Sequence, residues 1–199
     1  MEAWLATSPW PGVILWIFLY ISDYYLTLYS ARGFREIGHF QFEGSFELTP
    51  QYQKDIDALK PVSRLHITLL ILYSLLIIFI WWFTQYFFYL HWAYLLYLGM
   101  FLLLEAAVHI RHLRNVSLIR EIRKNGGVEG QISYRKWLTY KVSAFEFYMS
   151  SVLFLIVAAL TYSLFFLGGA IMCFGTGLKH TGLAKKAKSS LSRPVETTP

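Results

Sequence analysis

The stretch that decides the fold is LHITLLILYSLLIIFIWWFTQYFFYLHWAYLLYLGMFLLL, residues 65–104, forty residues without one aspartate, glutamate, lysine or arginine. As a single helix it would be about 60 Å long, roughly twice the hydrocarbon core of a bilayer. It therefore predicts two membrane spans joined by a short turn. Composition agrees, because 56% of the 199 residues are hydrophobic and only 15% are charged, against about 25% charged in soluble domains.

Two further apolar regions flank this pair. Residues 12–31 are long enough to cross a membrane, and they lack the basic n-region and the cleavage site of a secretory signal. We therefore interpret them as a retained first span. The last apolar block, residues 145–178, is too long for one ordinary span and only just long enough for two.

The placement of the basic residues decides between one and two spans in that block. The 18 lysines and arginines form three clusters, one after residues 12–31, one after residues 92–112 and one after the last block. Basic loops stay in the cytoplasm. Two spans in the last block place all three clusters inside, whereas one span would place the third outside.

We therefore predict an all-α polytopic membrane protein. It is a five-helix transmembrane bundle with the N-terminus outside and the C-terminus cytoplasmic, in a prokaryotic plasma membrane because no eukaryotic targeting signal is visible. A single transmembrane domain covers residues 1–183, and a disordered basic tail follows at 184–199. The predicted spans are residues 12–31, 65–88, 92–112, 145–161 and 164–179.

The cytoplasmic segments, 32–64 and 113–143, predict a small cap. Aromatic residues alternate with polar and small ones over residues 40–48, which favours a short β-hairpin. Thr49 and Pro50 then suit the start of a helix that ends before Pro61. Apolar residues at helical spacing extend the third helix into the cytoplasm as far as Asn125. Residues 128–134 are a candidate strand that would pair with the hairpin.

Three acids are predicted at membrane depth, where an ionisable group is expensive and is a functional candidate. Asp23, Glu105 and Glu146 would lie roughly 8–14 Å inside the cytoplasmic boundary, so they could meet at one level of the bundle. For Glu146 a simpler reading is available, because residues 143–146 form a capping box in which Ser143 and Glu146 start the fourth span.

Glu105, His109 and His112 are spaced by four and three residues, so they share one helical face. This pattern is compatible with a proton relay or with part of a transition-metal site that Asp23 or His39 would complete. The alternative is that Glu105 makes an ion pair or hydrogen bonds inside the bundle and that the histidines are interfacial.

Asp23 is surrounded in sequence by tyrosines, whose hydroxyls can stabilise a buried carboxylate. It is either a satisfied packing acid or part of a water-lined path. The candidates for an ion or proton pathway are Asp23, Tyr24, Tyr25, Glu105, His109 and His112. Gly169, Cys173 and Gly177 form a small-residue stripe that allows close helix packing, within one subunit or in an oligomer.

The intramembrane acids and the small-residue stripe favour a homo-oligomeric channel or transporter with the acids on its pathway. One alternative is a membrane-embedded enzyme acting on a lipid or lipid-linked substrate at the cytoplasmic face. The other is an accessory subunit of a larger membrane complex. The expected partners are the bilayer and further membrane subunits. The net charge of +6 follows from topology, so it gives no argument for nucleic acid.

Overall fold

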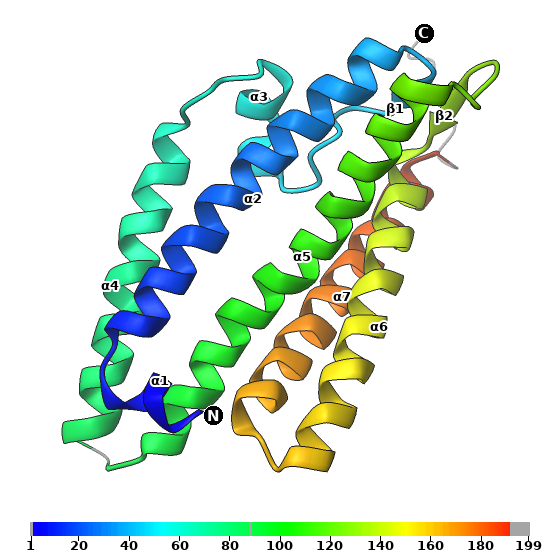
Figure 1. The fold of residues 1–199 in the computed structure, drawn as a ribbon. Helices are drawn as coiled ribbons and strands as arrows, with labels where there is room; N and C mark the ends of the chain where they lie inside the picture. The colour runs from blue at the N-terminus through cyan, green and yellow to red at the C-terminus, as the bar shows by residue number, and fades with distance from the viewer. Residues whose placement is uncertain (1, 88, 192–199) are drawn as a thin grey trace, which may run out of the picture.

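The computed structural model describes residues 2–87 and 89–191 as an elongated bundle of helices (Figure 1). The elements in chain order are α1 (Ala3–Thr7), α2 (Trp10–Ile37), β1 (Phe40–Phe42), α3 (Pro50–Asp57), α4 (Arg64–Tyr86), α5 (His91–Asn125), β2 (Ile132–Tyr134), α6 (Lys136–Thr161) and α7 (Leu164–Leu191).

Four helices in the described part of the chain have the length and apolar composition of a membrane span: α2, α4, α5 from Trp92 onward, and α6. The expectation of an all-α membrane protein therefore holds. Local signals set the helix ends. Proline lies in the first turn of α2, Gly38 ends α2 with φ +75°, and the Ser63 hydroxyl accepts the His66 N–H at the start of α4.

The last apolar block forms two antiparallel helices. α6 ends at Thr161, Tyr162 adopts φ +54°, and the Ser163 hydroxyl accepts the Phe166 N–H at the start of α7. α7 is not one of the four helices named above. It continues as helix through residues 184–191, where we expected a disordered tail, because alanine and lysine there are good helix formers. The rest of the expected tail, residues 192–199, lies outside the described residues.

The capping box predicted at residues 143–146 is wrong. α6 begins at Lys136, so Ser143 and Glu146 lie in its third turn, where every backbone N–H already has a helical partner. The polar sequence of residues 136–142 masked this start, because it resembles a loop when hydropathy alone is considered.

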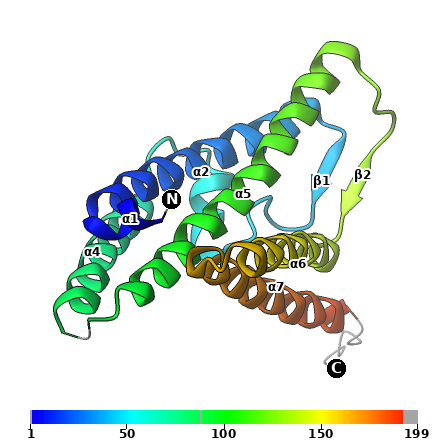
Figure 2. The ribbon, with the colours of Figure 1, turned by 60° about the horizontal axis from the view of Figure 1, so that its bottom comes forward.

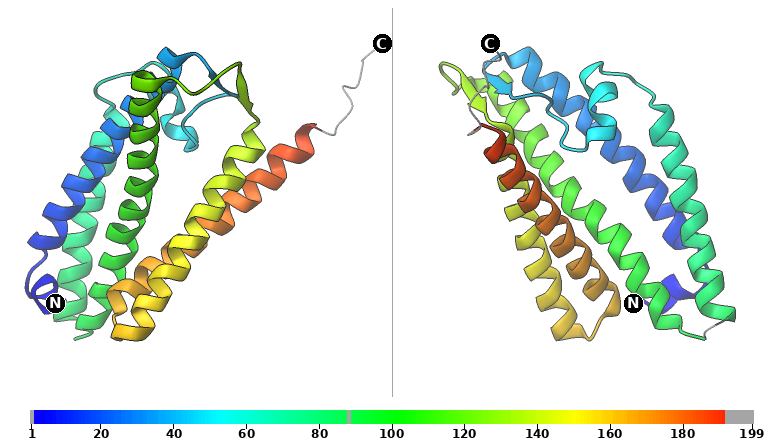
Figure 3. Two further views of the ribbon diagram at one scale, coloured as in Figure 1. Left: turned by 45° about the vertical axis from the view of Figure 1, so that its right-hand side comes forward. Right: turned by 180° about the vertical axis from the view of Figure 1, so that it is seen from behind.

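α5 is the central helix and lies between α2 and α7 (Figure 2), with α4 packed on α2 and α6 on α7. One apolar core fills the space between α2, α4 and α5 around Trp16, Tyr94 and Leu98. A second core, around Phe154 and Cys173, joins α5, α6 and α7. Both views of Figure 3 place the N-terminus and the α6–α7 turn at the end opposite the two strands.

The two loops at the strand end form a cap. β1 pairs with β2 in parallel, with Phe40 opposite Ile132 and Phe42 opposite Tyr134. The hairpin expected within residues 40–48 is replaced by this pairing between loops. Gly44 turns the chain with φ +87°, and the Ser45 hydroxyl then donates to Asp57 of α3, so the segment after β1 is drawn toward α3.

Candidate functional site

A cavity of about 650 Å³ lies beneath the cap, between α2, α5, α6, α7 and the segment that contains α3. Its lining combines four carboxylates, three basic side chains and three histidines. These are Asp23, Glu47, Glu105 and Glu146; Arg111, Arg114 and Lys179; and His66, His112 and His180. Such a concentration of ionisable groups along apolar helices is the main functional signal of this molecule.

Asp23 and His112 meet across the α2–α5 interface. His112 Nε2 lies 2.9 Å from Asp23 Oδ1 and 3.2 Å from Thr27 Oγ1, and the imidazole is buried. The approach to Asp23 has ion-pair distance, but its angle falls short of a hydrogen bond. We take it as a close electrostatic contact. Asp23 and His112, which the sequence analysis considered as members of one site, are thus adjacent.

Glu105 is buried and lines the same cavity. Its Oε2 has no hydrogen-bond partner among the described residues. Asp23 and Arg111 are the charged groups that act on it. An unpartnered polar atom in a buried site costs about 1–3 kcal/mol, so this oxygen is the place where a donor from a ligand would be most stabilising.

His109 is not part of the cavity lining, although it shares a helical face with Glu105 and His112. Its Nε2 lies 2.7 Å from Ser22 Oγ and its Nδ1 lies 2.7 Å from the Glu105 carbonyl oxygen. Both ring nitrogens are therefore occupied, one within α5 and the other joining α5 to α2. In the part of the chain that the structure describes, no three histidine, cysteine, aspartate or glutamate side chains form a group that could hold a metal ion.

Arg111 was missed as a site residue because it is the first basic residue after a long apolar run and was read as a boundary signal. Its Nη1 donates to Ser143 Oγ at 2.8 Å, and its guanidinium lies 5.7 Å from the Phe147 ring centroid. His180 Nδ1 lies 2.9 Å from the same Ser143 hydroxyl. Among the described residues no carboxylate comes within ion-pair distance of Arg111, so several of its five N–H donors remain for a ligand.

Glu146 is placed differently from the other acids. It pairs with Arg114 on α5 and so joins α6 to α5 at the edge of the cavity. These partners are 32 residues apart on different helices, so no local sequence pattern predicts their contact. Asp23, Glu105 and Glu146 all line this one cavity, but Glu146 is already paired with Arg114 there.

The tyrosines that precede and follow Asp23 divide between two surfaces. Tyr24 lines the cavity and its hydroxyl donates to the Lys60 carbonyl, whereas Tyr25 is 53% exposed on the outer face of α2. Helical geometry explains the division, because neighbouring residues point about 100° apart. Tyr25 therefore does not belong to the cavity.

An aromatic cluster closes one end of the cavity. The Tyr20 and Tyr52 hydroxyls are 2.6 Å apart, and the His66 ring stacks on Tyr20 with 4.3 Å between centroids. Glu47 extends from the cap into the same region, where its Oε1 accepts the Thr49 N–H at 2.6 Å. Burial raises the pKa of Glu47 above its ordinary value.

The small-residue stripe of α7 is used within this chain. A Cβ at Gly169 would lie 2.5 Å from Leu103 of α5, one at Gly177 would lie 2.7 Å from Tyr148 of α6, and Cys173 is completely buried. The stripe therefore brings α7 close to both neighbours inside the subunit.

Comparison with protein families, with curated proteins and with solved structures finds no significant match. Function is inferred from the chemistry of the cavity itself.

The cavity lining ends at a common level. On α2, α5, α6 and α7 the lining residues farthest from the cap are Tyr20, Leu104, Phe147 and Met172, respectively. Below them the helices are packed by the two apolar cores. At the polar end, Asp23 with His112 and Glu105 could transfer protons, and Arg111 could bind an anionic oxygen. The arrangement is a polar pocket with one closed, apolar end.

Proposed function

We propose that this protein is a membrane-embedded enzyme that acts on a lipid or lipid-linked substrate at the cytoplasmic face. The observation that carries the proposal is the buried cavity, in which Glu105 and the Asp23–His112 pair lie beside Arg111 and above closed apolar packing. A passage for ions needs a polar route to the other face, whereas a substrate site needs only one opening.

The proposal includes the five-span topology, with α7 as the fifth span and the cap in the cytoplasm. All 18 basic residues then lie on the cytoplasmic side. The carboxyl end of α5, the cap and the end of α7 lie together in Figure 1, at the end of the bundle where the cavity is found. A lipid headgroup would reach the cavity from that side.

The lining suits an amphipathic molecule. Aromatic and aliphatic side chains, among them Phe34, Phe42 and Leu118, line the cavity together with the charged groups. In the proposed arrangement Arg111 binds an anionic oxygen of the substrate. Glu105 accepts a proton from the substrate, and His112, held beside Asp23, supplies one.

The test compares lipid extracts by mass spectrometry from cells that express the wild-type chain, Glu105→Gln or Glu36→Gln. Glu36 is a matched control, because it pairs with Arg123 on the surface outside the cavity. We expect expression of the wild type to change the amount of one lipid class and Glu105→Gln to reduce the turnover by about 100-fold or more, while Glu36→Gln acts as the wild type does. Identical lipid profiles in all three strains and in cells without the protein would refute an enzyme of lipids.

A transporter is the second candidate, and the presence of Asp23 and Glu105 on one internal cavity favours it. A transporter that faces one side of the membrane also has a cavity with a single opening. Purified protein in liposomes that contain a pH-sensitive dye separates the two proposals. Proton movement that depends on Glu105, together with unchanged lipid profiles, would support transport and exclude the enzyme.

A further inference from the structure

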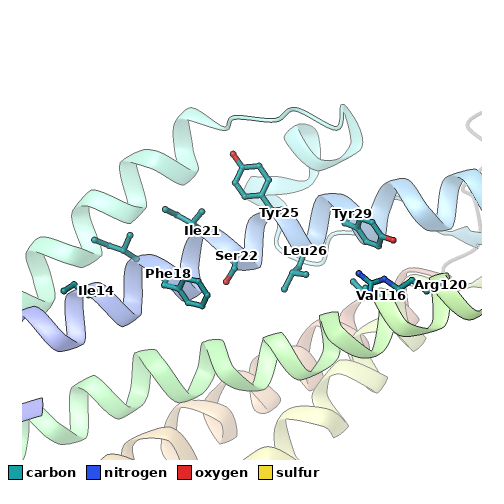
Figure 4. A pocket seen from close by; sticks show the side chains of 10 residues that line it. Ile14, Phe18, Ile21, Ser22, Tyr25, Leu26, Tyr29, Val116 and Arg120 are labelled. Carbon is teal, nitrogen blue, oxygen red and sulfur yellow. The ribbon is translucent and has the colours of Figure 1, made fainter. Parts of the chain in front are cut away.

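A second concavity lies on the outer face of α2, away from the polar cavity. It has a volume of about 770 Å³ and runs along α2 beside α5. Figure 4 shows its side chains following α2 from Ile14 to Tyr29, with Val116 and Arg120 contributed by α5. Sixteen residues of helix correspond to about 24 Å, which exceeds the roughly 15 Å depth of one leaflet's hydrocarbon.

The groove is apolar along most of its length and basic at one end. Ile14, Phe18 and Ile21 are exposed large hydrophobic side chains that face it. At the end nearest the cap, Arg120 lies beside Tyr29 (Figure 4). This is the order of groups that a phospholipid requires, with an acyl chain followed by a phosphate.

The charge of Arg120 is unpaired within the part of the chain that the structure describes. No described residue makes a hydrogen bond or an ion pair with its side chain. Its neighbour Arg123 differs, because Arg123 pairs with Glu36 and lies 5.9 Å from the Tyr29 ring centroid. Glu36 is thus already paired, and Glu121, which follows Arg120 on α5, accepts from the Asn125 side-chain amide. A guanidinium next to a free tyrosine hydroxyl binds phosphate well.

The depth of Arg120 also suits a headgroup. Ile119 packs against Gly33 of α2, so Arg120 lies at the level where α2 changes from its apolar run to Arg32. Basic residues at this boundary face the anionic lipids of the cytoplasmic leaflet.

We infer that the groove binds one anionic phospholipid, with an acyl chain along Ile14, Phe18 and Leu26 and its phosphate at Arg120 and Tyr29. The site is distinct from the polar cavity and does not depend on the proposed reaction. A zwitterionic lipid binds less well, because its own cation would lie close to the positive charge of Arg120.

The experiment is native mass spectrometry of the full chain released from micelles that contain phosphatidylglycerol and phosphatidylcholine in equal amounts. We expect the wild type to retain one phosphatidylglycerol, and Arg120→Gln to lower its affinity about fivefold, the factor that corresponds to ~1 kcal/mol for one basic residue near an anionic headgroup. Arg64→Gln removes the same charge from the start of α4, outside the groove, and is expected to behave as the wild type.

A second variant, Leu26→Trp, fills the groove without changing charge and is expected to reduce retention of the same lipid. Equal retention of both lipids, or equal losses in Arg120→Gln and Arg64→Gln, would overturn the inference. A dimer that Leu26→Trp converts to a monomer would also overturn it, because a second copy of the chain would then occupy the groove.

Discussion

A close backbone contact between α5 and α7 predicts a large effect from a single methyl group at Gly168. A Cβ there would lie 2.0 Å from the Leu96 carbonyl oxygen of α5. Ordinary contacts begin at 3.4 Å, so α5 and α7 would have to separate locally by about 1.4 Å. Because the obstacle is backbone, no side-chain rotation relieves it. Overpacking of this kind costs about 1–3 kcal/mol, and Gly168→Ala should lie at the upper end of that range.

Gly175 on the same helix supplies a control, because alanine at this position is expected to change the stability in the opposite direction. A Cβ at Gly175 meets nothing within 4 Å. Alanine is favoured over glycine inside a helix by about 0.5–1 kcal/mol, so Gly175→Ala should stabilise the protein slightly. Thermal unfolding in one detergent, followed by tryptophan fluorescence, compares the two variants. If Gly168→Ala unfolded at or above the temperature of Gly175→Ala, the backbone contact between α5 and α7 would be refuted.

Three further predictions concern the cap and the topology. Burial raises the pKa of Glu47 above its ordinary value of 4.5, so the folded state loses stability as pH rises past that value, and Glu47→Gln should gain stability over the wild type as pH rises above 4.5; an equal difference in unfolding temperature at every pH would contradict this. The Lys60 ammonium donates to Asp55 and holds the pKa of Asp55 below its ordinary value of 3.8, so Lys60→Met should weaken the cap at neutral pH and progressively less as pH falls below 3.8, as measured by limited proteolysis. In a Cys173→Ala background, Tyr162→Cys should react with an impermeant maleimide added outside intact cells; labelling only after the cells are opened would place the α6–α7 turn in the cytoplasm and exclude the five-span topology.

Much of the bundle could be predicted from local patterns. Apolar length located the spans, and the glycines after Asn125 marked the end of α5, whereas α2 continues to Ile37, past the predicted end of the first span at residue 31. The start of α6 could not be predicted in this way. Residues 136–142 are helical because they continue a helix that packs on α7, which hydropathy does not record. The pairing of a strand in residues 128–134 with the first loop was predicted, whereas its parallel direction and its register were not.

The site was predicted only where the partners share a helical face or a membrane depth. Asp23, Glu105 and His112 were found in this way. His109 has the spacing that places it on the same helical face as Glu105 and His112. Whether its ring faces the cavity or Ser22, however, depends on the rotation of α5 against α2. Arg111 and Ser143 approach one another from different helices 32 residues apart, and nothing in either local sequence indicates that contact.

The partners of the cavity acids indicate which of them a ligand must satisfy. Asp23 has His112 beside it, Glu47 accepts a backbone N–H, and Glu146 pairs with Arg114. For Glu105 Oε2 the described residues provide no partner, and the nearest unpaired positive charge is that of Arg111. Replacing a buried acid by an apolar side chain of similar volume is often neutral or stabilising. Stability alone therefore gives no reason to keep Glu105, whereas a substrate that places a donor on Glu105 and an anionic oxygen on Arg111 would satisfy both groups at once.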